Sequence, residues 1–267
     1  MTSQVQERAN IFGIPLDRLD QAGAIKRILS WCAQGLCGHV VTVNLDFLVK
    51  ARTDPVFARV ISDADLSLAD GMPLVWASHI SGMSLPERVT GADLIVPLCK
   101  EAAKAGRSVF LMGSTFETLT AAARKLVAHA PRLEIAGVYA PAFGFSALGP
   151  NTELEDFITA VRPDILFVAL GAPKQEIWAR FARDHLPVHA VLGIGAGLDF
   201  IAGVHARAPQ WLQRLGLEWL YRFLSEPRRL GLRYAACGII LPRLMLGEIS
   251  HACRRRLGLK MKKTCAL

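Results

Sequence analysis

Residues 164–170 form the apolar run DILFVAL, which constrains the fold more than any other part of the chain. Its near-continuous hydrophobicity is typical of a parallel strand covered by helices on both faces. Gly171 then permits a sharp turn, and Pro173 suits the first turn of a helix. Ligands of open α/β sheets bind beyond such strand ends, so free backbone N–H groups beside Lys174 and Gln175 predict a phosphate or diphosphate site. An ordinary strand-to-helix connection is the alternative interpretation.

The same pattern recurs along most of the chain. Apolar runs typical of strands lie at residues 39–43, 65–69, 108–112, 134–138, 164–170 and 188–194. Helical patterns alternate with them at residues 46–52, 55–62, 92–105, 115–128, 154–161 and 175–185. This alternation predicts an α/β fold with a Rossmann-like parallel sheet flanked by helices.

The composition fits a folded protein with a substantial core. The chain has 267 residues, of which 52% are hydrophobic, enough for one large α/β domain with an appendage. Its first ten residues lack the apolar centre of a secretory signal, and no stretch offers about 18 uninterrupted apolar residues. We therefore expect a cytoplasmic protein. The six cysteines form no C-x-x-C pair, which argues against a zinc site or a disulfide framework.

The formal net charge of +8 is concentrated near one end. Residues 1–204 contain 18 Lys or Arg against 20 Asp or Glu, whereas residues 205–267 contain 13 against 3. We predict a catalytic domain at 1–204 and a helical basic appendage at 205–267 that meets an anionic surface. The apolar stretch 238–246 is too short to span a bilayer, but the basic residues after it predict an interfacial membrane anchor. A core-packing helix with a solvated basic end is the alternative.

Polar side chains follow two of the predicted strands. Asp70 comes directly after residues 65–69, a position where general bases commonly lie. The alternative is that Asp70 caps a helix at 72–80. Thr42 and Asn44 project to the same side at the end of another strand. Both are able to hydrogen-bond a sugar or phosphate, although Asn44 could equally cap the next helix.

Other motifs argue against metal and nicotinamide sites. The glycines of 193–197 lack the G-x-G-x-x-G spacing of dinucleotide-binding proteins. Asp199, just beyond them, can accept hydrogen bonds from a base or ribose, or can cap a helix. The D-x-D at 63–65 superficially matches a metal-binding motif of many glycosyltransferases, but it precedes its strand, so solvated loop carboxylates are favoured. We predict no metal site and no cofactor.

Seven motifs, in order, resemble the WecG/TagA/CpsF glycosyltransferases, and the similarity covers about residues 11–234. They are TVN at 42–44, ADG at 69–71, RVTG at 88–91, GAPKQE at 171–176, GAGLDFIAG at 195–203, RAP at 207–209 and LEWLYRFLSEPRR at 217–229. The resemblance implies an inverting, metal-independent transfer of a hexose or N-acetylhexosamine from a UDP-sugar to a polyprenyl-diphosphate-linked sugar. It places this reaction at the cytoplasmic membrane face, in capsule, exopolysaccharide or teichoic-acid-type synthesis. The region after Tyr234 extends beyond the family's usual end.

The resemblance also implies roles for individual residues. Asp70 is similar to the family's general base, and Asp199 to the residue that reads the uridine. Thr42, Asn44, Arg88 and Gln175 are similar to substrate-pocket residues, and the tail arginines to those that complete the site.

Without a metal, arginines must stabilise the departing diphosphate. The predicted substrate-binding set therefore also includes Arg222, Arg228, Arg229 and Arg233. Gly171 and Lys174 belong to it as part of the predicted phosphate site after residues 164–170.

Two other functions are weaker interpretations of the same sequence. A nucleic-acid-binding protein could use the six Lys or Arg at 254–263, but no aromatic residues interleave there, so we expect no nucleic-acid partner. A nicotinamide-dependent oxidoreductase fails on glycine spacing. The expected partners are a UDP-sugar, a lipid-linked acceptor and an anionic membrane surface, and a homo-oligomer is possible.

Overall fold

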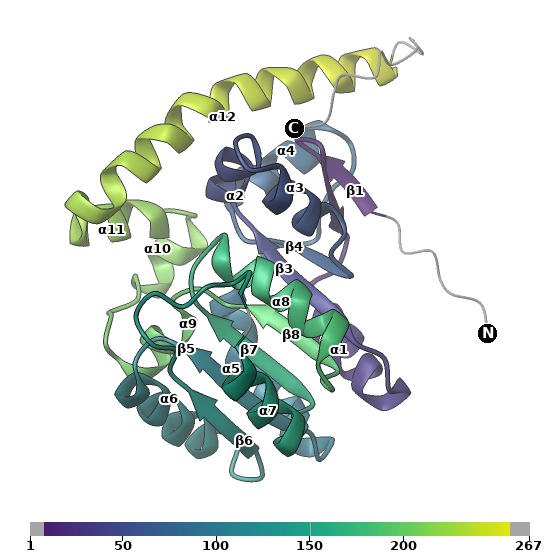
Figure 1. Ribbon diagram of the computed structural model, residues 1–267. Helices are drawn as coiled ribbons and strands as arrows, with labels where there is room; N and C mark the ends of the chain where they lie inside the picture. The colour runs from purple at the N-terminus through teal and green to yellow at the C-terminus, as the bar shows by residue number, and fades with distance from the viewer. Residues whose placement is uncertain (1–7, 150, 257–267) are drawn as a thin grey trace.

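A computed structural model describes residues 8–149 and 151–256. Its centre is a six-stranded sheet in which all neighbouring strands are parallel, in the order β4-β3-β8-β7-β5-β6 (Figure 1). The strands are β3 (Gly38–Val43), β4 (Leu66–Ala69), β5 (Ser108–Gly113), β6 (Glu134–Tyr139), β7 (Ile165–Ala169) and β8 (Ala190–Gly193). All six were predicted, and the Rossmann-like α/β class is confirmed.

Helices cover both faces of the sheet, which explains why most of its strand residues are apolar. Along β7, Ile165 and Phe167 face one core while Leu166 and Val168 face the other. The first face packs against α1 (Gln21–Gln34), α5 (Gly91–Lys104), α6 (Phe116–His129) and α9 (Gly197–Ala202). The second packs against α2 (Leu45–Ala51), α3 (Pro55–Ser62), α4 (Met72–Ile80), α7 (Thr152–Val161) and α8 (Lys174–His185).

Elements near the start of the described chain were not predicted. A short antiparallel hairpin, β1 (Arg8–Ile11) and β2 (Ile14–Asp17), precedes α1. Its turn is formed by Phe12 and Gly13, both with positive φ. The hairpin packs in the same core as α2, α3 and α4, so it extends the domain beyond the central sheet.

The C-terminal region consists of α10 (Gln210–Arg214), α11 (Glu218–Ser225) and α12 (Pro227–Arg256). The reading of 238–246 as a separate short apolar segment was wrong, because α12 continues through Pro242 for 30 residues. Within the described chain, the stretch Leu230–Arg254 is long and apolar enough to cross a membrane by length and composition. The predicted basic residues Lys260, Lys262 and Lys263 lie outside the described residues.

One side of α12 is docked on the body, against α2 and α4 (Figure 1). Glu248 is only 5% exposed. It accepts hydrogen bonds from the Phe12 backbone N–H at 2.7 Å and from the Ser81 hydroxyl at 2.5 Å. Leu230 and Ile240 are buried on the same side. The predicted boundary near residue 204 is therefore crossed by extensive packing, and it stays a prediction.

Candidate active site at the carboxyl edge of the sheet

Most of the predicted site residues meet at the carboxyl ends of adjacent strands. Asp70 follows β4, and Thr42 and Asn44 end the neighbouring strand β3. The backbone N–H of Asp70 donates to the Val43 carbonyl at 2.7 Å, which fixes the two strand ends together. Since β8 and β7 come next in the sheet, the turn at Gly171 lies along the same edge.

Asp70 does not cap α4. The N-cap residue of that helix is Gly71, and no side chain bonds to the helix N-terminus. The pKa of Asp70 is raised to about 7, chiefly by burial; Arg88 and Arg222 oppose this rise, and the carboxylates of Glu218 and Asp93 contribute to it. A carboxyl group with this pKa is suited to exchange a proton near neutral pH.

The RVTG segment is pressed against the ends of β4 and β3. The Val89 N–H donates to the Ala69 carbonyl at 2.9 Å. A Cβ atom on Gly91 would lie 3.2 Å from both the Thr42 hydroxyl and the Ile194 Cα. Glycine at this position therefore permits the close approach that brings Arg88 beside the strand that carries Asp70.

Two of the predicted substrate-binding amides are bonded within the protein. The Asn44 side-chain oxygen accepts from the N–H groups of Asp46 and Phe47, so Asn44 does cap α2. The Gln175 oxygen accepts from Gly171 N–H at 3.1 Å and Gly195 N–H at 3.0 Å, and its NH₂ group donates to Glu176. Gln175 thus joins the turns that follow β7 and β8, while Gly171 and Lys174 are exposed at the edge.

Asp199 is held by a residue from another strand end. The Ser114 hydroxyl, directly after β5, donates to an Asp199 carboxylate oxygen at 2.7 Å. Ser114 has a φ of 47°, which is uncommon for a residue with a side chain. Such local strain is concentrated at functional sites. The pair lies farther along the edge from Asp70, because β5 and β4 are separated by three strands.

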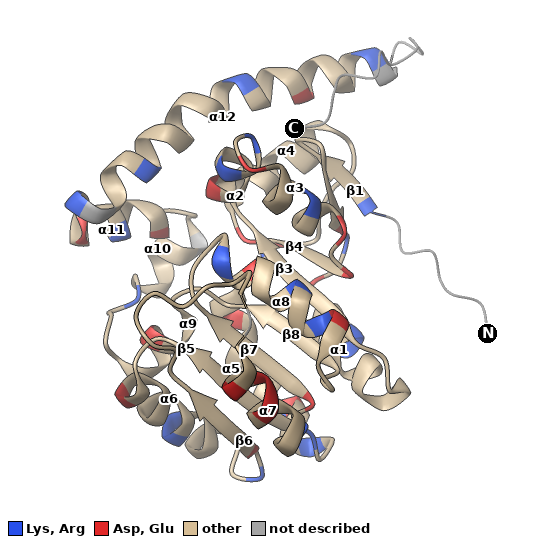
Figure 2. Ribbon diagram, in the orientation of Figure 1, with Lys and Arg blue, Asp and Glu red and all other residues tan. Residues whose placement is uncertain are grey.

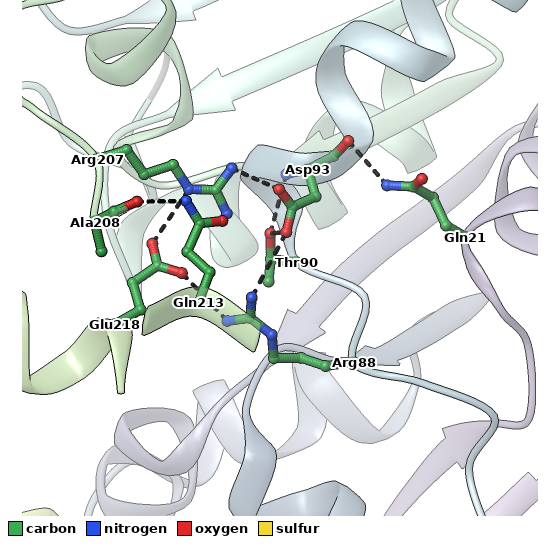
Figure 3. Close-up of polar contacts among 8 residues, drawn as sticks. All are labelled: Gln21, Arg88, Thr90, Asp93, Arg207, Ala208, Gln213 and Glu218. Atoms are coloured by element: carbon green, nitrogen blue, oxygen red, sulfur yellow. Dashed lines mark hydrogen bonds and ion pairs between the residues drawn. The ribbon is translucent and has the colours of Figure 1, made fainter. Parts of the chain in front are cut away.

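Arg88 belongs to a network of ion pairs that joins the appendage to the domain (Figure 3). Its guanidinium lies 3.3 Å from Glu218 on α11 and 3.9 Å from Asp93 on α5. Arg207 contacts the same two carboxylates, at 2.5 Å for Asp93 and 3.3 Å for Glu218. Desolvation opposes charge on the Asp93 carboxyl, but the bonds from Arg207 and Thr90 outweigh it and lower its pKa.

The three predicted tail arginines whose side chains are described have different surroundings. Arg222 on α11 is close enough to act electrostatically on Asp70. Arg233 forms an ion pair with Asp46 of α2 at 3.2 Å, and Arg228 is exposed. The side chain of Arg229 lies outside the described residues.

Two hollows border the site. One of about 200 Å³ lies between α9 and α11, and its lining includes Ala196, Phe200, Tyr221 and Arg222. The Arg222 guanidinium is 5.6 Å from the centre of the Phe200 ring. The other, of about 480 Å³, is lined by Met72, Glu87, Arg88, Gln210 and Gln213. Arg222 of α11 thus lines one hollow, and Arg88 lines the other.

Sequence reasoning did not single out Asp93, Arg207 or Glu218. Arg207 and Glu218 lie within the RAP and LEWLYR motifs, which were the available signal. The D-x-D carboxylates form ion pairs with arginines of α8: Asp65 pairs with Arg183 at 2.8 Å, and Asp63 lies 3.8 Å from Arg180.

Comparison with known proteins identifies the family of this chain. Residues 9–256 match the model of the glycosyl transferase WecG/TagA/CpsF family, so the expectation that the region after Tyr234 extends beyond the family's usual end was wrong as far as residue 256. A Bacillus spizizenii protein named N-acetylglucosaminyldiphosphoundecaprenol N-acetyl-beta-D-mannosaminyltransferase is 33% identical over 190 residues, covering 71% of this chain and 72% of that protein. A Staphylococcus aureus protein of the same name is 30% identical over 234 residues, covering 85% and 90%. The chain therefore belongs to the WecG/TagA/CpsF family and is a glycosyltransferase.

Proposed function

We propose that this enzyme transfers a hexose or N-acetylhexosamine from a UDP-sugar to a polyprenyl-diphosphate-linked sugar, with inversion and with Asp70 as the general base. The observation that carries the proposal is the environment of Asp70. Asp70 follows a strand end, its pKa is raised to about 7, and Arg88 and Arg222, which each line one of the two hollows, act electrostatically on its carboxyl group. A base and nearby cations are what a single displacement of a diphosphate needs.

In the proposed reaction, Asp70 takes the proton of the acceptor hydroxyl while that oxygen bonds to the donor's anomeric carbon. The bond from this carbon to the diphosphate oxygen breaks, and its electron pair leaves with UDP. Fixed cations stabilise the charge that develops on the leaving group. We assign this role to Arg88 and Arg222 and predict that the reaction proceeds without a divalent metal.

The relatives suggest the first substrates to test. Their name describes transfer of N-acetylmannosamine to an undecaprenyl-diphosphate-linked N-acetylglucosamine. We infer an acceptor of the same class for this enzyme, in the synthesis of a cell-envelope polysaccharide. The hydroxyl orientation of the donor sugar is recognised by pocket shape, so a panel of donors is needed.

The decisive assay is UDP release from a panel of UDP-hexoses and UDP-N-acetylhexosamines, with and without a synthetic lipid-diphosphate-N-acetylglucosamine, in EDTA with vesicles. We expect acceptor-dependent release with one donor. Restoration of activity only by added Mg²⁺ or Mn²⁺ would contradict metal independence. Absence of both release and UDP binding across the panel would contradict the proposed function itself.

We further propose that the enzyme is peripheral, with the outer side of α12 lying on the membrane. Leu232, Ile239 and Leu246 are 88%, 73% and 67% exposed, and their spacing of seven residues places them on one side of the helix. Basic residues are spread along α12, at Arg228, Arg233, Arg243 and Arg254, and the acidic Glu248 lies between the last two (Figure 2). Because the opposite side is bonded to the body through Glu248, this docked arrangement favours a helix in the plane of the interface.

Replacing Leu232, Ile239 and Leu246 together by Ser should weaken binding to anionic phospholipid vesicles by at least about tenfold, since each buried apolar side chain contributes about 1.5 kcal/mol or more. Vesicle co-sedimentation measures this. The matched control replaces exposed apolar residues elsewhere, at Leu36, Val56 and Phe116. Equal binding by the two triple variants would contradict the assignment of this surface.

A further inference from the structure

Glu218 is the one residue of α11 that bonds to two different arginines in the described network (Figure 3). Its Oε2 lies 3.3 Å from Arg88 Nη1, and its Oε1 lies 3.3 Å from Arg207 Nε. The Glu218 side chain is only 14% exposed, and that of Arg88 only 16%. Charge pairs shielded from solvent in this way hold a more defined geometry than exposed pairs.

The network fixes Arg88 from two sides. Asp93 Oδ2 is 3.9 Å from Arg88 and also accepts from the Thr90 hydroxyl at 2.8 Å. Arg207 bridges Asp93 and Glu218, so two cations alternate with two anions. The four charges come from the RVTG segment, α5, the chain after α9, and α11. The appendage is thus locked to the domain at the residue that the proposed mechanism uses to bind diphosphate.

Glu218 also matters for the base. Asp70 is next to the strand residue Ala69, whose carbonyl accepts from Val89, the neighbour of Arg88. Arg88 lowers the pKa of Asp70, and Glu218 raises it. An Arg88 guanidinium released from Glu218 would be free to pair with the Asp70 carboxylate, which would weaken the base and withdraw the cation from the leaving group.

We infer that Glu218 is a positioning residue, which keeps Arg88 oriented for substrate and away from Asp70 and thereby makes the docked appendage a working part of the active site. This inference rests on the proposed function of Asp70 and Arg88. It goes further in assigning a role in the reaction to an acidic residue of the otherwise basic appendage.

The test is Glu218→Gln, assayed with UDP-N-acetylmannosamine and a synthetic polyprenyl-diphosphate-N-acetylglucosamine in vesicles. We expect kcat/KM to fall by about 10- to 100-fold, the scale of one lost charged hydrogen bond. The acid limb of the pH–rate profile should move to lower pH, because Arg88 then lowers the pKa of Asp70 without the opposing effect of the Glu218 carboxylate. A merely structural role for Glu218 would lower activity without moving this limb, and that result would overturn the inference.

The matched control is Asp184→Asn. Asp184 also bridges two arginines, Arg180 at 2.8 Å and Arg183 at 2.7 Å, but it lies at the far end of α8 from the site. We expect this variant to keep both kcat/KM and the pH limb. Equal effects of the two substitutions would overturn the inference.

Coupling within the network supplies a second criterion. Arg207→Gln should reduce kcat/KM, and adding it to Glu218→Gln should cost little more, because both substitutions break one unit. Full additivity would overturn the inference.

Hydrogen exchange distinguishes a failure of this inference from a failure of the proposed function. Glu218→Gln should speed exchange of the α11 amides even if the wild-type enzyme transfers none of the tested sugars. Unchanged exchange of the α11 amides would directly contradict the view that the ion pairs of Glu218 hold α11 on the domain.

Discussion

Replacement of Asp70 by Asn should reduce kcat by about 10²- to 10⁴-fold, the usual contribution of a general base, while the Kd for UDP changes little. The amide keeps the shape of the side chain but cannot accept the acceptor's proton. Measurement of turnover together with UDP binding by calorimetry checks both parts. Asp63→Asn, in the exposed D-x-D, is the control and should retain full activity. Equal loss of turnover and UDP binding in Asp70→Asn would make Asp70 structural instead.

The same substitution should affect stability in a direction set by pH. Because the pKa of Asp70 is raised to about 7, the wild-type protein loses stability as pH rises from about 4 through 7, where the unfolded carboxyl ionises more readily than the folded one. Asn carries no charge at any pH. Asp70→Asn should therefore raise the melting temperature more at pH 8 than at pH 5, while wild-type activity rises through pH 7. A larger gain at pH 5 would contradict the burial of this charge.

Replacement of Gly113 by Ala should destabilise the fold by about 3 kcal/mol or more. Gly113 ends β5 with a φ of 112°, and a Cβ atom there would lie 2.3 Å from the backbone oxygen of Ala169 on β7. The strand ends must separate to relieve this contact. Ser114 follows directly and holds Asp199, to which the family resemblance assigns the uridine, so we predict that the variant also binds UDP less tightly. Urea unfolding measures the first effect and calorimetry the second.

Gly106→Ala is the matched control for Gly113→Ala. Gly106 also has a positive φ, of 63°, but no atom lies within 4 Å of a Cβ built on it. Only backbone strain of about 1 kcal/mol is expected, without a change in UDP affinity. If the two alanine variants were equally destabilised, close packing of β5 against β7 would not be the cause.

The central sheet was predictable because its strands are mostly apolar and, apart from the edge strand β6, buried along almost their whole length. The hairpin of β1 and β2 gave a much weaker signal. Its strands have four residues each, and its turn uses Phe12 in a left-handed conformation instead of a typical turn residue. The signals for α1 were present, since Asp20 caps its start and Gly35 ends it. A proline inside a helix usually bends or ends it, yet Pro242 lies on the exposed side of the continuous helix α12.

The candidate site was predictable where one strand end determined the chemistry, as at Asp70. It was not predictable where partners come from distant segments. Arg88 and Glu218 are 130 positions apart, and no local pattern indicates that they meet. Gln175 and Asn44 were chosen for their polar groups, but the structure commits their oxygens to neighbouring backbone N–H groups.

The bond from Glu248 to Phe12 means that the last described helix completes the first described hairpin. Removal of α12, by a premature stop codon or by truncation in the laboratory, would leave the Phe12 N–H without its partner and uncover the part of that core against which Leu244 and Met245 pack. A shortened enzyme would thus fold poorly and would also lack the surface that we propose to bind the membrane. Its inactivity would not tell which of the two losses is the cause. Point substitutions on the outer side of the helix are the way to separate the two.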